Sequence, residues 1–391
     1  MRISIFRWRW LLIVVCVLGL VLLSGWWLRY SKSSARDAAA RECRTLRAAK
    51  QWKRLAEVAR RWSEWDADNA DPWLYRAESA EEMREAVSTA EYLSRVPEKD
   101  PRAALALVKL ATLQFEVLNH PREGEKTCER ILRINPKVTQ AHGQLIFYAL
   151  STLQRQELIR RIRAAIRVRR ESPECYVFLA GTHWLYPANL YRLNTHWLKS
   201  EPDSEMYQVA RAMQVYTSNA KTNPERAAEF EDIPTAEELL RKFPHNTEVL
   251  AYHLENRIED GDVEVVEKLL KASDPTTLHD ARFWRAKAWL QDTNGDSEAA
   301  EASLKRALEI DPYWWKLHFQ LMEIYRRYQR SDEFGRMSEI YEKSKRLSKI
   351  ITTLDDGKSP GSEFYDLMLF LAIASGDDLV ANALRFRQQQ Q

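Results

Sequence analysis

Glycine is scarce in this chain, with 11 residues among 391. The sequence contains neither a GxxxxGK[ST] phosphate loop nor a GxGxxG turn after a strand. It also lacks HExxH and GxSxG, the local signatures of zinc peptidases and serine hydrolases. Eight histidines are scattered along the chain, and no two have the spacing of a metal-ligand pair. These absences predict a non-catalytic protein with no bound cofactor, metal or small-molecule substrate.

Cysteine is also rare. Cys16 lies in an apolar run, whereas Cys43, Cys128 and Cys175 are far apart and form no CxxC pair. Three distant cysteines do not make a disulfide framework. Buried, small apolar side chains are therefore the expected role of these three.

One long apolar run is present, from Trp10 to Leu28, between Arg9 and Arg29. At about 1.5 Å per residue its length matches the roughly 30 Å core of a bilayer. We therefore predict a single-pass transmembrane helix at 10–28, with a basic segment 1–9 before it and a linker 29–35 after it. A cleaved signal peptide is the alternative. The short N-terminus predicts that the large domain is extracytoplasmic, although basic residues on both sides of the run give little asymmetry.

Net charge separates the N-terminus from the rest. Six basic and no acidic residues precede position 37, so they account for the whole formal charge of +3. The remaining chain is nearly balanced, which disfavours nucleic acid as a partner because nucleic-acid-binding domains are usually basic.

The remaining sequence has an all-helical composition. Ala, Leu, Glu, Arg and Gln fill segments that Pro, Asn and Asp interrupt. Pro72, Pro101 and Pro136 recur at intervals near 34 residues, and Pro275 and Pro312 do the same later in the chain. A repeat of this length with two helices is typical of helical arrays.

Residues 281–312 form the clearest unit. Trp284 and Ala288 pair a large with a small side chain on the first helix, Gly295-Asp296 form the turn, and Pro312 ends the second helix. The inward positions of the second helix are Ala300, Leu304 and Ala307. This unit resembles the tetratricopeptide repeat (TPR). The resemblance implies an all-α, TPR-like solenoid of about seven helix pairs after the transmembrane helix, and a protein or peptide as the partner.

The predicted organisation follows from these units. An N-terminal array spans 36–220, an irregular connection 221–234, a C-terminal array 235–351, a loop 352–362, capping helices 363–387 and a frayed tail 388–391.

In repeats of this family the first helix of each pair lines the binding groove. The resemblance assigns groove positions to two successive first helices: Arg282, Arg285, Trp289, Asp292, Lys316, Phe319, Glu323 and Arg326. Arg285 and Lys316 are predicted to hold a peptide carboxylate, beside apolar contacts from Trp289 and Phe319.

Two other functions remain open. Arg160, Arg163, Arg167 and Arg170 share one side of a helix within 155–170, and this side is either a solvated face or a site for an anionic polymer or lipid headgroups. The aromatic segment 174–203 contains His183-Trp184 and His196-Trp197, the place where an enzyme or enzyme subunit would have its site. Ordinary packing or surface histidines are the favoured interpretation.

Overall fold

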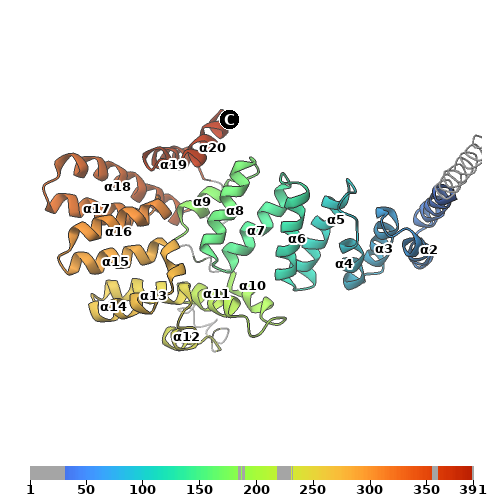
Figure 1. Ribbon diagram of the computed structural model, residues 1–391, viewed down its shortest axis with the longest axis horizontal. Coiled ribbons are helices and arrows are strands. Elements are labelled where there is room, and N and C mark those ends of the chain that lie inside the picture. Colours follow the sequence, from blue (N-terminus) through green and yellow to red (C-terminus); the bar gives the residue numbers. More distant parts are fainter. Residues whose placement is uncertain are drawn as a thin grey trace, which may run out of the picture. The chain divides into compact units, whose positions relative to one another are not determined.

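The computed structural model describes residues 31–183, 186, 190–217, 230, 232–354 and 360–389. All regular elements within these residues are helices (Figure 1). The predicted transmembrane segment 10–28 lies outside the described residues. Of the helices that are described, none is both long and apolar enough to cross a membrane.

The chain forms two compact units, Met1–Leu118 and Asn119–Gln391. This division does not coincide with the connection predicted at 221–234, most of which lies outside the described residues.

The first unit, described from residue 31, consists of a helix at 31–48, α2 (Trp52–Trp65), α3 (Ala70–Glu82), α4 (Ala86–Ser94), α5 (Ala103–Thr112) and the short π-helix η1 (Leu113–Val117). The linker expected at 29–35 is therefore helical from residue 31. Asp66, just after α2, accepts hydrogen bonds from Arg36 (2.6 Å), Trp62 (3.2 Å) and Asn69 (2.9 Å). Burial opposes ionisation of Asp66, but these donors lower its pKa to about 2. This carboxylate fixes the first helix to the turn after α2.

The second unit contains most of the helices. They are α6 (Pro121–Ile134), α7 (Thr139–Ser151), α8 (Arg155–Arg167), α9 (Glu174–Ala180), α10 (Tyr191–Trp197), α11 (Glu205–Tyr216), α12 (Ala236–Lys242), α13 (Thr247–Glu259), α14 (Val263–Ala272), the 3-10 helix η5 (Pro275–His279), α15 (Ala281–Thr293), α16 (Ser297–Ile310), α17 (Trp315–Arg327), α18 (Ser331–Thr352), α19 (Ser362–Ala374) and α20 (Asp378–Gln388). Consecutive helices pack as antiparallel pairs, most extensively α15 with α16 and α17 with α18.

The turns between successive helices share one backbone conformation. A residue with positive φ recurs every 34 or 35 positions: Lys50, Arg84, Asn119 and Leu153, then Gly261, Gly295 and Gln329. After most of them the next amide donates to a carbonyl five residues earlier, as from Asp296 to Gln291 (2.9 Å) and from Arg330 to Tyr325 (3.0 Å). This is the Schellman ending of a helix. The repeat period seen in the prolines is thus also present in the backbone conformation.

A second recurring feature is a hydrogen bond that stabilises the start of the first helix in several pairs. A ring N–H donates to the carbonyl six residues earlier in four repeats: Trp73 to Ala67 (2.8 Å), His142 to Pro136 (2.9 Å), Trp284 to Leu278 (2.8 Å) and His318 to Pro312 (2.9 Å). Trp and His therefore occupy one equivalent position. Each ring satisfies a carbonyl of the turn that enters the helix.

The clearest predicted unit, 281–312, is confirmed in detail. Ala288, Ala300 and Ala307 are buried together with Leu304 in one core. Gly295 has a φ of +84°, and the Asp296 carboxylate accepts from the Ala299 amide (3.1 Å) as the N-cap of α16. Helix α16 ends at Ile310, before Pro312.

The last two helices, α19 and α20, match the predicted capping helices in position, but they cover more than the end of an array. They share one core with α8, α9 and the end of α18. Asp377, which caps α20, accepts two hydrogen bonds from Arg163 of α8 (3.0 and 2.6 Å) and one from Tyr313 (3.0 Å). The C-terminal helix of the second unit therefore packs against α8, near the start of that unit.

Candidate functional site

The residues predicted to line a groove are placed in different environments. Arg282 is 2% exposed and Arg285 is 6% exposed, whereas Phe319 is 39% exposed. Trp289 is half-buried and packs against the core of α13 and α14. The expectation that Arg282 lies on an open groove is therefore corrected: its guanidinium is in the interior of the unit.

Arg282 belongs to a buried network of four charged side chains. It donates to Asp280 (2.6 and 3.0 Å) and to Glu248 (2.5 and 3.0 Å). Arg155 of α8 donates to the same Glu248 carboxylate (2.9 and 3.1 Å), and its guanidinium lies over the Tyr186 ring, 4.6 Å from the centroid. Two guanidinium groups and two carboxylates balance each other here.

The network joins three parts of the second unit, because its members begin α8, α13 and α15. Burial alone would raise the pKa of Asp280, but Arg282 lowers it below its usual range. One wall of a cavity of about 690 Å³ includes Arg155, Glu248 and Asp280. The arrangement accounts for Arg282 as an internal partner of acidic side chains rather than as a ligand for a peptide.

His183 and His196, the pair considered for an enzyme site, do not share an environment. His183 is buried, donates from Nδ1 to Asp311 (2.7 Å) and stacks on Trp314 with 4.4 Å between ring centroids. His196 is exposed on α10. A space of only about 20 Å³ adjoins His183, which has room for roughly one water molecule. We interpret the His183–Asp311 pair as a packing contact between α9 and the turn after α16.

Three buried histidines predict acid sensitivity. Burial lowers the pKa of His142, His183 and His318 below the ordinary value. Unfolding releases these rings to titrate near pH 6.5, so the unfolded chain binds more protons below that pH. We expect the free energy of unfolding to fall as pH decreases below about 6.5, by up to about 1.4 kcal/mol per pH unit per histidine.

Urea midpoints measured between pH 8 and 5 would test this, with His318→Gln as the comparison. Glutamine can still donate to Pro312 but does not titrate, so its slope against pH should be shallower. Identical slopes for the two proteins would contradict the assignment. The range from pH 8 to pH 5 includes the ordinary pKa of histidine, roughly 6.5.

The predicted arginine stripe of α8 is divided. Arg160 pairs with Glu157 and Arg163 with Asp377, whereas Arg167 and Arg170 are exposed. Arg169, in the turn that follows, lies over the Phe386 ring at 3.8 Å from its centroid. Two of the four predicted arginines thus hold the protein's own carboxylates, which supports the solvated-face interpretation for that part of the helix.

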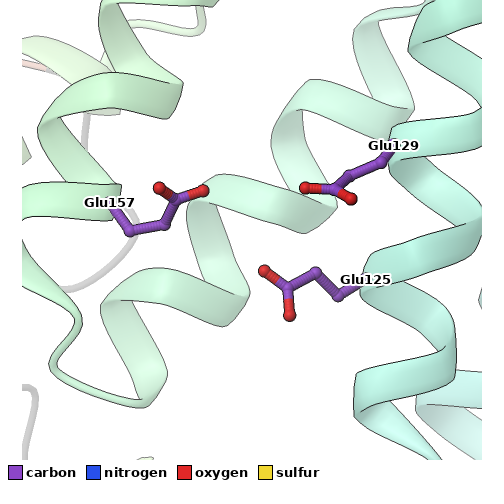
Figure 2. Close-up of side chains that lie close together, drawn as sticks. All are labelled: Glu125, Glu129 and Glu157. Atoms are coloured by element: carbon purple, nitrogen blue, oxygen red, sulfur yellow. The ribbon is translucent and has the colours of Figure 1, made fainter.

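A feature that the sequence did not reveal lies beside Arg160 on α8. Glu125 and Glu129 of α6 and Glu157 of α8 point toward one another (Figure 2), with carboxylate atoms within 4.8 Å. Arg161 pairs with all three, at 2.5 Å from Glu129 and 3.5 Å from Glu125. Burial and the neighbouring carboxylates outweigh Arg161 and raise the pKa of Glu125. Because a guanidinium already supplies positive charge, the cluster is explained without a metal ion.

Arg161 and its neighbour Arg160 provide a matched test. The Arg161 side chain is 8% exposed and Arg160 is 58% exposed. Arg161→Met should lower the free energy of unfolding by about 2–4 kcal/mol at neutral pH, because three carboxylates lose their counter-ion. Arg160→Met should cost less than about 1 kcal/mol.

The Arg161→Met loss should shrink as pH falls, since protonation of Glu125, whose pKa is raised, removes part of the repulsion. Chemical denaturation at two pH values measures both effects. Equal losses for the two variants would contradict a special role for Arg161.

A partly exposed surface lies on the first helices of three successive pairs, where Phe319 and Glu259 are exposed but the Arg285 side chain is buried against Glu255. We define the A-helix surface as Glu255 and Glu259 of α13, Arg285, Trp289 and Asp292 of α15, and Lys316, Phe319 and Glu323 of α17. Its charges are largely paired within the protein: Arg285 with Glu255, Lys316 with Glu259 (3.5 Å), and Asp292 with Arg327 (2.7 Å). Phe319 packs against Tyr341 of α18 with 5.5 Å between centroids, yet stays partly exposed. The predicted carboxylate clamp is therefore already occupied by Glu255, and the apolar groups are the available contacts.

No family model matches the chain, and no curated protein matches it. Among solved structures, a tetratricopeptide repeat protein from Parabacteroides merdae is 13% identical, with 62% of this chain and 93% of that chain covered and a TM-score of 0.27. The C-terminal part of a TPR repeat-containing protein from Cytophaga hutchinsonii is 14% identical, covering 71% and 97%, with a TM-score of 0.28. Yeast Tom70 is also 14% identical, covering 89% and 78%, with a TM-score of 0.27.

TM-scores this low do not support a conclusion about function. The class of the protein is given by its own geometry: antiparallel helix pairs whose turns recur every 34 or 35 residues. The described residues form a TPR-like, all-α array of repeats.

Proposed function

We propose that this chain is a non-catalytic scaffold that binds a protein or peptide partner through the A-helix surface. The observation that carries the proposal is the partly exposed Phe319, with Lys316 and Glu323 at i−3 and i+4 on the same face of α17. Exposed aromatic groups among paired charges are typical of protein interfaces. Because the array is already folded, a partner would bind a surface whose ordering cost has been met.

The sequence motivates a second element of the proposal. The apolar segment 10–28 is proposed to anchor the chain in a membrane, with the array on the extracytoplasmic side. Anchoring would raise the local concentration of the array near membrane partners. This element rests on the length and flanking residues of the segment alone.

The other two hypotheses have less support. An anionic-polymer site on α8 would depend on Arg167 and Arg170, since Arg160 and Arg163 contact acidic side chains. An enzyme site in 174–203 would need His183, whose buried ring is paired with Asp311.

The proposal predicts the effect of changing the A-helix surface. The full chain would be crosslinked to its partners in membranes of the producing cells, purified and compared with a Lys316→Glu, Phe319→Ala variant. Partner recovery should fall at least about tenfold, because a central aromatic contact and its charged neighbour are lost. The helical circular dichroism should not change.

The matched control changes two exposed residues that are not part of the named surface, Tyr328 at the C-terminal cap of α17 and Arg306 of α16. A Tyr328→Ala, Arg306→Glu variant should retain the partner. Retention by both variants would count against the A-helix surface as the interface.

A further inference from the structure

Helix α18 is unusually long for a second helix of a pair. It has 22 residues, whereas α8, α14 and α16 have 13, 10 and 14. The extra turns have two faces. Leu347 and Ile351 are buried against α9 and α19. The other face carries Lys345, Arg346 and Lys349, all exposed. The extension therefore presents a basic surface that the repeat pattern does not require.

A groove runs along this basic face. Its volume is about 1140 Å³, and its walls are α18, α19 and the start of α17. Apolar side chains contribute to the lining: Trp315, Ile350, Leu367 and Phe370. Each of these is partly exposed rather than buried in a core. We call this feature the α18–α19 groove.

The basic side chains of the groove differ in how far they are engaged. Arg346 pairs with Glu363, and Lys345 donates to the Tyr341 hydroxyl (2.9 Å). The Lys343 ammonium lies 4.4 Å from the centre of the Phe370 ring. Lys349 makes no ion pair within the described part of the chain. Lys349 is thus a rim cation without an acidic partner among the described residues, and aromatic rings also line this groove.

The acidic side chains of the groove limit what it can bind. Glu342, Glu363 and Asp366 also line it. A polyphosphate chain or an anionic lipid surface would bring many negative charges close to these three carboxylates. A peptide can instead place a carboxylate at Lys349 and an apolar side chain against Phe370 and Trp315. The mixed lining therefore fits a peptide better than it fits a polyanion.

We propose that the α18–α19 groove binds an acidic peptide segment of a partner protein that also carries aromatic or aliphatic side chains. The carboxylates lie at Lys345 and Lys349, and the apolar side chains contact Trp315, Leu367 and Phe370. This inference rests on the proposed scaffold function, but it concerns a second surface with its own partner chemistry.

The test uses purified full-length chain and a fluorescein-labelled synthetic peptide that alternates Glu with Phe and Leu. Two matched peptides replace every Glu by Lys, or every Phe and Leu by Ser. Fluorescence anisotropy should show binding of the first peptide that weakens as salt is added. Both matched peptides should bind at least about tenfold more weakly, because each lacks one half of the recognised chemistry.

Variants then locate the peptide. Lys345→Glu, Lys349→Glu should weaken binding by about tenfold or more, since both rim charges are reversed. Lys268→Glu, a single charge reversal at an exposed position of α14, should leave binding unchanged. Unaltered affinity in the double variant, equal affinity for the Lys peptide, or no binding at about 1 mM peptide would overturn the inference.

The outcome is separable from that of the scaffold proposal. Loss of the cellular partner on changing the A-helix surface, together with no peptide binding in the groove, would remove this inference alone. If the peptide binds in the groove but the A-helix variant retains its cellular partner, the A-helix surface is excluded as the interface and the proposal for the groove stands.

Discussion

Replacing Glu248 by alanine is expected to lower the free energy of unfolding of the second unit by about 3–5 kcal/mol. The Glu248 carboxylate accepts hydrogen bonds from both Arg155 and Arg282, whose side chains are 7% and 2% exposed. Its removal leaves two buried guanidinium groups with one remaining carboxylate, Asp280. An uncompensated buried charge is among the few causes of so large an effect. Chemical denaturation of the purified chain, followed by circular dichroism, measures it.

Two further variants separate the effect of the Glu248 charge from other effects of the substitution. Glu248→Gln keeps the shape and part of the hydrogen bonding, so its loss should lie between that of alanine and zero. Glu298→Ala removes an exposed glutamate from the first turn of α16 and should cost less than about 1 kcal/mol. A loss for Glu248→Ala no larger than for Glu298→Ala would show that the buried network does not stabilise the unit.

The second large effect is expected at Asp377. Asp377→Ala should lower the free energy of unfolding by about 2–4 kcal/mol, because it removes the partner of Arg163 and the N-cap of α20 together. The Asp377 side chain is 7% exposed, but Arg163 is 27% exposed and can regain some water. We therefore expect a smaller loss than at Glu248.

A double-mutant cycle tests the contact itself. Arg163→Met and Asp377→Asn should be coupled by about 1–3 kcal/mol, since both change one ion pair. Tyr313→Phe, which removes the third hydrogen bond to Asp377, should couple with Asp377→Asn as well. Additive losses would mean that α20 is held on α8 by apolar packing alone.

The sequence predicted the repeat best where its residues are specific to the local geometry. Gly295 is the residue that tolerates a positive φ, and Asp296 is a good N-cap, so the turn of 281–312 was readable. Its alternating large and small side chains also identified the buried face.

Other repeats use the same turn with less specific residues. Lys50, Arg84, Leu153 and Gln329 adopt positive φ although they carry Cβ atoms. The surrounding helix pair imposes that conformation, at a cost of about 1–2 kcal/mol each. The sequence has no glycine at these turns, so local residue preference does not reveal them.

The groove assignment failed at Arg282 for a tertiary reason. Its place in the helical register is the expected one, but α8 approaches the starts of α13 and α15 and buries it. That approach joins residues 93 positions apart in the case of Arg155 and Glu248, and 214 apart in the case of Arg163 and Asp377. Periodicity within one repeat contains no information about contacts at these separations.

Site-specific photo-crosslinking tests the central claim, that the A-helix surface contacts a partner, most directly. A photoreactive phenylalanine analogue would replace Phe319 in one protein and Tyr328 in another, both within the full chain in its own cells. Phe319 lies on α17 and Tyr328 caps its C-terminus, and both are solvent-accessible, at 39% and 57% exposure. The account predicts a discrete crosslinked product from position 319 that position 328 does not give. Products from both positions alike, or from position 328 only, would contradict it.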